Sequence, residues 1–337
     1  MLSSLSCARA RYADTIHIEG DKFHVQGIAW DNKKECLYCS FTSAFFKTDI
    51  QGNIIGSVNG INGHLGDITF NPRTRKAYAS LEYKNDEIGK GIADALGAER
   101  HDDKLSRFFI AEIDVDKILG LDTPFEEVAQ LHPVAEAGAD YLAEVEINGA
   151  VLKHRYGCSG IDGISLGPEF GSRSAKATHL YVAYGIYRDT LRHDNDYNIL
   201  LCYDLKDLDK PKHKYFVYTG NTTYGIQNLE YDSFTGRMYL AVYPGKKSQF
   251  PNYRLFALDM TQKPYSGKPK NVPYHENDVQ MIDVLKGWHF KWGSTGLCPL
   301  GKGKYYISHN GKDEKGQYCK ATLYYNSQSE DSPFERP

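Results

Sequence analysis

The sequence of 337 residues lacks the features of a membrane protein or a nucleic-acid-binding protein. It contains no apolar run of about 18 residues, the length that a transmembrane helix needs. Residues 1–20 contain no apolar core of the kind found in secretory signals. Lys and Arg (40) do not outnumber Asp and Glu (43), and the net charge is −3. We therefore expect no membrane partner, no nucleic-acid partner and a cytoplasmic location; a secreted protein that has been processed would have the same features.

Motifs of several common enzyme classes are also missing. There is no Walker-type phosphate loop, so no nucleotide cofactor is expected, and neither a GxSxG elbow nor an HExxH zinc motif occurs. The seven cysteines are scattered and odd in number. Cys36 and Cys39 form a CxxC, but they lie in a predicted strand, where residues three apart point to opposite faces. The cysteines are therefore predicted to be buried apolar residues.

The sequence does contain a repeat. A pair of small or polar residues precedes an aliphatic residue, a turn rich in Asp, Asn, Gly, Lys and Arg, and a second run of the type Leu/Met-Tyr-x-small. Five copies match this pattern, and they start at Gln26, Gly66, Asp162, Gln227 and Thr295. The second run of each copy carries a tyrosine, at Tyr38, Tyr78, Tyr181, Tyr239 and Tyr306. Each copy is predicted to be an antiparallel hairpin, so part of the large tyrosine content (25 residues) belongs to the architecture.

Further strand-like runs follow each hairpin, which predicts four strands per repeat and an all-β protein with a β-propeller fold. We expect five four-stranded blades in one domain over residues 1–337, with the outer pair of the fourth blade at 254–259 and 279–284. Residues 14–18 are expected to supply the missing outer strand of the last blade and so close the ring. The stretch between Ile68 and Ile164 leaves room for a sixth or seventh blade. It holds two insertions, around 84–105 and 133–160, and residues 88–99 have a helical pattern.

The longest connections in such a propeller would share one face, which is typical of a binding cleft on a rigid scaffold. The inner strands are unusually polar towards this face, where the sequence places Asp67, Asp162, Gln227 and Asn228. Carboxylate and amide oxygens suit Ca²⁺ or another divalent cation, so these four residues are the candidate metal ligands. The alternative is that the same side chains hydrogen-bond ordered water in the channel and bind no metal.

Three residues are candidates for proton transfer in the cleft. His64 and Glu82 lie in the second repeat, and His289 lies in the segment GWHFKWG before the fifth repeat. Trp288 and Trp292 of that segment could stack on a substrate, or the segment could be an aromatic plug packed under the loop. The remaining candidate substrate-binding residues lie in predicted cleft loops, at Tyr83, Tyr187, Arg188, Tyr224 and His309. Arg188 could recognise an anion or simply be solvated.

The repeats also resemble a known family. The segments VQGIAWDNKKECLYCS, GDITFNPRTRKAYAS, IDGISLGP and IQNLEYDSFTGRMYLAVY are similar to blades of the calcium-dependent propellers of the gluconolactonase (senescence-marker/regucalcin) family, and more loosely to phytase-like propellers. The resemblance implies a propeller with a calcium-assisted lactonase or esterase activity. That family opens with a Glu-Gly-Pro motif whose Glu binds the metal, and Gln26 stands at the corresponding position here.

Three functions follow from these patterns. The first is a hydrolase or lyase that acts on a small polar, sugar-related substrate in the central cleft with the help of a divalent cation. The second is a metal-independent glycoside hydrolase or polysaccharide lyase that uses tyrosine, histidine and carboxylate side chains. The third is a propeller that binds a ligand or a protein without catalysis.

Overall fold

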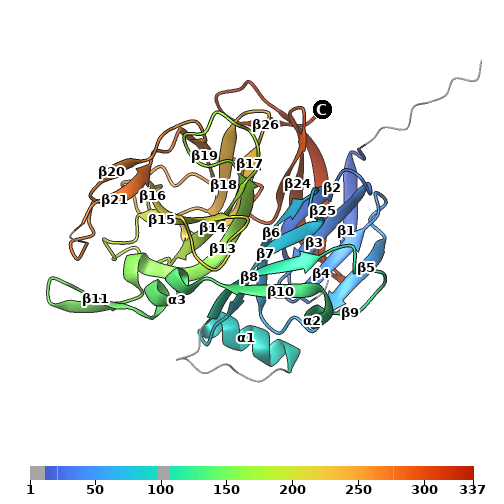
Figure 1. Cartoon of the computed structure of the whole chain (residues 1–337), viewed down its shortest axis with the longest axis horizontal. Coiled ribbons are helices and arrows are strands. Elements are labelled where there is room, and N and C mark those ends of the chain that lie inside the picture. The colour runs from blue at the N-terminus through green and yellow to red at the C-terminus, as the bar shows by residue number, and fades with distance from the viewer. Residues whose placement is uncertain (1–11, 21, 98–106, 276) are drawn as a thin grey trace, which may run out of the picture.

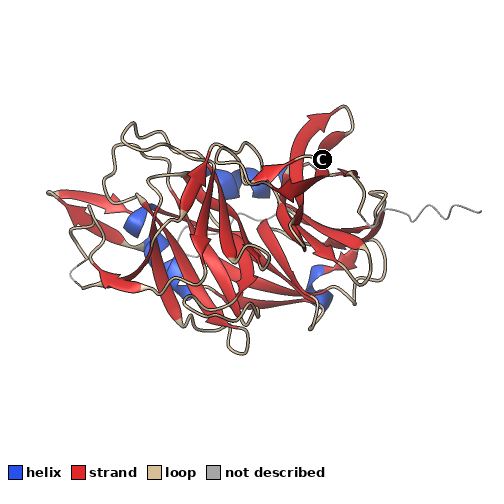
Figure 2. Ribbon diagram, turned by 90° about the horizontal axis from the view of Figure 1, so that it is seen from above, coloured by secondary structure: helices blue, strands red, loops and turns tan. Residues whose placement is uncertain are grey.

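A computed structural model describes residues 12–20, 22–97, 107–275 and 277–337. In this part of the chain five mainly antiparallel β-sheets follow one another as blades, and their innermost strands surround a central channel. Figure 1 shows the arrangement of these sheets. Strands dominate the molecule and the helices are short (Figure 2). The all-β five-bladed propeller expected from the repeat is therefore confirmed.

The five hairpins of the repeat form the two innermost strands of each blade. The first strands, which line the channel, are β2 (Val25–Asp31), β6 (His64–Asn71), β13 (Cys158–Gly167), β17 (Thr223–Asp232) and β23 (Leu297–Gly301). Their partners are β3 (Cys36–Phe41), β7 (Lys76–Tyr83), β14 (His179–Ile186), β18 (Arg237–Tyr243) and β24 (Lys304–Asp313).

The turn residues of the repeat explain why three of the five hairpins form. Asp31 accepts a hydrogen bond from the backbone N–H of Lys33 (2.9 Å), and Asn71 and Asp232 accept equivalent bonds two residues further along. An Asp or Asn side chain that bonds its own backbone in this way favours a tight turn. The repeated tyrosines Tyr38, Tyr78, Tyr181, Tyr239 and Tyr306 are all buried, which confirms their architectural role.

The outer strands complete the blades. In the first blade they are β4 (Ala44–Thr48), β5 (Ile54–Asn59) and β9 (Thr123–Pro124), and in the second blade they are β8 (Arg107–Asp114) and β10 (Ala129–Pro133). In the third blade they are β15 (Tyr197–Asp204) and β16 (His213–Tyr218), and in the fourth they are β19 (Leu255–Asp259) and β22 (Lys286–Trp288).

The last blade contains the two ends of the described chain. β25 (Gly316–Asn326) pairs with the N-terminal strand β1 (Thr15–Glu19) and with the short β26 (Phe334–Glu335). The register places Ile16 opposite Ala321 and Ile18 opposite Cys319, and both isoleucines are buried. The expected closure of the ring by the N-terminal strand is confirmed.

One strand assignment was wrong. The segment 279–284 was expected to complete the fourth blade, but β21 (Val279–Ile282) runs parallel to β16 and extends the third blade, together with β20 (Tyr265–Gly267). The outer strand of the fourth blade is instead β22, which pairs with β19 and places Trp288 opposite Leu255. The pairing of β16 with β21 joins segments far apart in the sequence, so local patterns do not indicate it.

The insertions add the helical parts. The first insertion contains α1 (Glu87–Leu96), and its residues 98–105 lie outside the described part of the chain. The short helix α2 (Phe125–Val128) precedes β10. The second insertion holds α3 (Ala135–Leu142), the hairpin β11 (Glu144–Ile147) with β12 (Ala150–Lys153), and a 3₁₀ turn at Arg155–Gly157. Within the residues described, no helix is both long and apolar enough to cross a bilayer.

The cysteines behave as expected of core residues. Cys36 packs in the hydrophobic cluster shared with the second blade, whereas Cys39 packs on the other side of β3, in the cluster shared with the last blade. The six cysteines that the structure describes are free and buried; Cys7 lies outside the described residues.

Candidate functional site

One end of the channel carries a pocket, and irregularities of the inner strands shape it. The pairing register shifts near this end in four blades: after Val25 in β2, after Leu65 in β6, after Cys158 in β13 and after Thr223 in β17. Such bulges turn side chains out of the regular alternation and are frequent beside binding sites. The pocket encloses about 170 Å³. Its polar and aromatic lining consists of His24, Gln26, His64, Glu82, Lys84, Asp86, Ser159, Asp162, Tyr187, Tyr224, Gln227 and Tyr243.

His64, Glu82 and Lys84 form a charged cluster at the pocket wall. Nδ1 of His64 lies 3.3 Å from Oε2 of Glu82, and Nζ of Lys84 lies 2.8 Å from the same oxygen. Burial alone would lower the pKa of His64, but its hydrogen bond to Glu82 and the negative charges of Asp162 and Glu82 raise the pKa above its usual value. Burial opposes the charge of Lys84 as well, and the carboxylates of Glu82 and Asp86 outweigh this and raise the pKa of Lys84.

The second oxygen of Glu82 is fixed by the backbone of the third blade. Oε1 accepts a hydrogen bond from the N–H of Ile161 at 2.6 Å. This approach requires a glycine at position 160, where φ is +115° and a Cβ atom would collide with the Glu82 carboxylate. With both oxygens engaged, Glu82 holds the imidazole of His64 in place as a carboxylate does in a catalytic His–carboxylate pair.

Asp162 faces the same pocket and is a second carboxyl beside His64. Only 8% of its surface is exposed, and Oδ1 is buried with no hydrogen-bond partner. Burial, together with the charge of Glu82, raises the pKa of Asp162 to about 7, although His64, Lys84 and a hydrogen bond from Gln227 favour the ionised form. A carboxyl and an imidazole in one pocket, both with raised pKa values, form a pair suited to acid–base chemistry.

Two of the four predicted metal ligands serve the architecture instead. Oδ2 of Asp67 accepts hydrogen bonds from the N–H groups of Ile164 (3.0 Å) and Leu229 (2.9 Å), and Oδ1 accepts one from Ile68. Asp67 is completely buried and joins the inner strands of three blades.

Asn228 plays a similar part. Its amide nitrogen donates to the carbonyl of Gln26 at 2.6 Å, and its oxygen accepts from the N–H of Leu297 at 3.1 Å. The oxygens of Asp67 and Asn228 are therefore occupied by backbone groups.

The pocket residues do not fit the calcium ion that the family resemblance implies. Ca²⁺ takes about six to eight oxygen ligands, whereas both oxygens of Glu82 are engaged and the ammonium group of Lys84 already neutralises this carboxylate. No cluster of three or more His, Cys, Asp or Glu residues with a metal-binding arrangement occurs in the described ranges. Asp162 and Gln227 remain at the pocket, so the structure brings together only half of the predicted ligand set.

The aromatic residues predicted for the cleft divide into two groups. Tyr187 and Tyr224 line the pocket, and Arg188 lies exposed above the Tyr224 ring, 5.9 Å from its centroid. Tyr224 has φ = +64°, an unfavourable backbone conformation that often occurs at functional sites. Tyr83 points away from Glu82 along β7 and lines an adjoining small cavity, in contact with Phe109.

The segment GWHFKWG lies elsewhere. Trp288 belongs to the outer strand β22 and is buried between the fourth and fifth blades, as the aromatic-plug alternative predicts. His289 is exposed and packs against Tyr253. Trp292 stacks on His309 at a centroid distance of 4.0 Å, and none of these residues lines the pocket.

Among the pocket residues that were not predicted from the sequence, three carry a His, Lys or Asp side chain. Lys84 lies just beyond the end of β7, two residues after Glu82, and His24 lies two residues before Gln26. Side chains two apart on an extended chain share a face, so the alternation could have indicated both. Asp86 caps α1 by accepting a hydrogen bond from the N–H of Gly89 (2.9 Å), a local pattern that gives no sign of the pocket.

A wider cavity of about 380 Å³ adjoins the pocket. Asp86 and Tyr187 line both spaces, and the two insertions form the outer walls through Lys90, Tyr141 and His154. Tyr187 packs on His154, which packs in turn on Tyr141, with 4.5 Å between the ring centroids in each pair. The insertions thus extend the site beyond the channel.

Comparisons with known proteins identify neither a family nor an activity for this chain. No family model matches the sequence, and no curated protein matches it. Among solved structures, the chain is similar to a GH43_1 enzyme from Xanthomonas citri complexed with xylotriose, with a TM-score of 0.44, 11% identity and coverage of 92% of this chain and 90% of that chain. It is also similar to a glucose dehydrogenase, with a TM-score of 0.41, 9% identity and coverage of 91% of this chain and 99% of that chain. Neither similarity bears on the chemistry of the pocket.

Proposed function

We propose that the channel pocket is the active site of a metal-independent hydrolase that acts on a small polar, sugar-like substrate. One observation carries the proposal: His64, held by Glu82, and the buried carboxyl of Asp162 share a single pocket. General acid–base catalysis requires a proton donor and a proton acceptor with pKa values near the working pH. Two carboxylates and a histidine fixed by the backbone provide both functions without a cation.

The roles follow from the two pKa shifts. His64 has a raised pKa and acts as the proton donor to the leaving oxygen, while Asp162, which ionises near pH 7, accepts a proton from the attacking water. The water oxygen forms the new bond to the substrate carbon as the bond to the leaving oxygen breaks. One proton passes from His64 to the leaving group and one from water to Asp162, and exchange with solvent restores both.

The remaining lining supports a hydroxylated ligand. Tyr187, Tyr224 and Tyr243 combine ring surface with a hydroxyl group, and Gln26 and Gln227 offer amide groups at the channel end. Small-molecule sites commonly combine apolar walls with a few fixed polar groups in this way. Arg188, exposed above the Tyr224 ring, adds positive charge that suits a sugar acid.

A substrate screen with matched variants tests the proposal. Purified protein is assayed on nitrophenyl glycosides, sugar lactones, acetylated sugars and uronic-acid oligosaccharides, in the presence of a chelator. His64→Gln and Asp162→Asn are each expected to lower turnover by about 10²–10⁴-fold. The control His132→Gln, in the outer strand β10 and outside the pocket lining, should retain activity.

Two results would contradict the proposal. Turnover that persists in both pocket variants would place the chemistry elsewhere. Binding of a sugar by the wild type, lost in both variants and never accompanied by turnover, would make the protein a binding propeller.

A further inference from the structure

The channel has a second cavity at its opposite end. It encloses about 290 Å³ and is lined by the same inner strands, further along each chain. β2 contributes Gln26 to the first pocket and Trp30 to the second, and β17 contributes Gln227 to the first and Glu230 to the second. Asp67, fixed by backbone groups of two other blades, lies between the two spaces on β6. We call this second space the lower cavity.

Glu230 is the unusual residue of the lower cavity. Only 6% of its surface is exposed, and in the described part of the chain its carboxyl makes no hydrogen bond and no ion pair. A buried carboxylate without a partner is costly, and such groups are normally paired or protonated. Burial, reinforced by the nearby charge of Asp67, raises the pKa of Glu230 well above its usual value.

The other charged groups around Glu230 form hydrogen bonds or ion pairs with other residues. Asp232, further along β17, accepts hydrogen bonds from the N–H groups of Phe234 and Thr235 and from the hydroxyl of Tyr305. Arg73, from the turn after β6, is exposed and donates to the carbonyl of Ala177 at 2.9 Å.

Arg75 and Cys298 are two further titratable groups near Glu230. Arg75 stacks over the Phe70 ring but pairs with Asp31 and Asp116. Cys298 of β23 contributes a buried thiol, and burial raises the pKa of this thiol well above its usual value. The structure therefore offers Glu230 no cationic partner among the residues that it describes.

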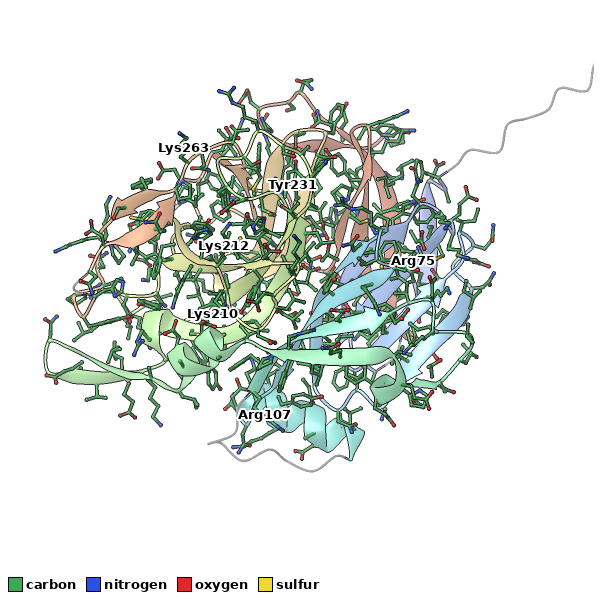
Figure 3. The ribbon with its side chains drawn as sticks, viewed as in Figure 1. Arg75, Arg107, Lys210, Lys212, Tyr231 and Lys263 are labelled. Atoms are coloured by element: carbon green, nitrogen blue, oxygen red, sulfur yellow. The ribbon has the colours of Figure 1, made fainter. Side chains whose placement is uncertain are left out.

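Aromatic rings form the rest of the wall. Trp30, Phe70 and Tyr231 line the lower cavity beside Glu230; Tyr231 is labelled in Figure 3. Aromatic faces attract organic cations, and a carboxylate provides the countercharge. A metal ion would need about six oxygen ligands, which one carboxyl among rings does not provide. An alkylammonium ion needs only one negative charge, which the carboxylate supplies, and apolar contact with the aromatic rings.

We propose that the lower cavity binds a small organic ammonium ion, whose charge pairs with Glu230 and whose alkyl groups contact Trp30, Phe70 and Tyr231. This site is separate from the proposed active site and does not depend on its chemistry. Because the free carboxyl holds a proton, binding of the cation releases that proton to the buffer.

Calorimetric titration of the full chain tests the proposal. The probes are n-butylammonium and tetramethylammonium chloride near pH 8 at constant ionic strength, with n-pentanol as the uncharged analogue of the first. Wild-type protein is expected to bind the ammonium ions and to release a proton, detected as a binding heat that changes with the ionisation enthalpy of the buffer. Glu230→Gln should bind them about tenfold more weakly or worse, and lose the proton release.

Matched variants separate the site from general charge effects. Glu126→Gln makes the same change at an exposed position outside the cavity and should bind as the wild type does. Tyr231→Leu keeps the carboxyl and removes a ring, and should weaken binding even if Glu230→Gln does not fold. Equal affinity of Glu230→Gln and the wild type, equal binding of n-pentanol, or no binding by the wild type would each overturn the proposal.

Discussion

Nδ1 of His64 lies 3.3 Å from Oε2 of Glu82, and this contact sets the charge of the imidazole in the pocket. Because Glu82 both hydrogen-bonds and attracts the protonated ring, Glu82→Gln should lower the pKa of His64. An imidazolium with a lower pKa loses its proton at a lower pH and can then no longer act as the proton donor. The alkaline side of the pH–rate profile should therefore move to lower pH, and the imidazole titration followed by NMR should move with it.

The control for this change lies in the same blade. Glu112 is 3.4 Å from His132, outside the pocket, so Glu112→Gln removes a carboxylate beside a histidine without touching the site. It should leave the titration of His64 unchanged. An unchanged His64 titration in Glu82→Gln would show that the contact does not set the charge of the imidazole.

Asp162 should make stability depend on pH. Its pKa in the folded protein is about 7, above the usual 3.8, so the folded state binds the proton more tightly than the unfolded chain does. The resulting stabilisation is complete below about pH 4 and is lost as the pH rises through 7. Asp162→Asn removes this dependence, and its unfolding free energy should exceed that of the wild type most clearly above pH 7. The difference should change by at most about 1.4 kcal/mol per pH unit.

Urea unfolding between pH 4 and 9 measures this difference. Asp189→Asn, at an exposed aspartate in the loop after β14, provides the comparison and should follow the wild type at every pH. A constant difference between Asp162→Asn and the wild type across this range would mean that the carboxyl does not titrate as proposed.

Sequence patterns predicted correctly those features of the fold that depend on residues close together in the chain. The Asp31 turn, the alternation of Cys36 and Cys39 across β3, and the buried isoleucines of β1 all follow from short segments. The role of Asp67 could not be predicted in this way, because its partners Ile164 and Leu229 lie 97 and 162 residues away.

The candidate site shows the same division. His64, Glu82 and Asp162 reach the pocket because they lie on inner strands that the repeat defines. His289 does not, because the pairing of β16 with β21 leaves β22 as the outer strand of the fourth blade and places this residue far from the channel.

Asp67→Asn should destabilise the propeller rather than affect only a site. The amide cannot accept every hydrogen bond that the carboxyl accepts, and each buried N–H left without a partner costs about 1–3 kcal/mol. A loss of about 2–5 kcal/mol in unfolding free energy is expected, measured in urea. Asp49→Asn changes a partly exposed turn aspartate that accepts similar bonds from the N–H groups of Gln51 and Asn53, and should cost far less. A loss in Asp67→Asn no larger than in this control would show that Asp67 is not a structural link.

Calcium should not stabilise the protein. Since the oxygens of Asp67, Asn228 and Glu82 are engaged within the chain, millimolar Ca²⁺ or a chelator should leave the thermal midpoint unchanged. A ligand that binds only the folded state raises the midpoint as its concentration exceeds the dissociation constant. A rise with Ca²⁺ that disappears in Asp162→Asn would restore a metal site at the pocket.

Closure of the ring by β1 should contribute strongly to stability. Ile16 and Ile18 are 1% and 0% exposed and pack against the last blade, whereas Thr15 of the same strand is exposed. Ile16→Ala and Ile18→Ala each remove a buried side chain and should lower the unfolding free energy by about 2–5 kcal/mol. Thr15→Ala, on the solvent face, should change it by at most about 0.5 kcal/mol. If the isoleucine variants unfolded at the same urea concentration as Thr15→Ala, β1 would be a dispensable edge strand, and the stability of the propeller would rest on the other strands of the last blade.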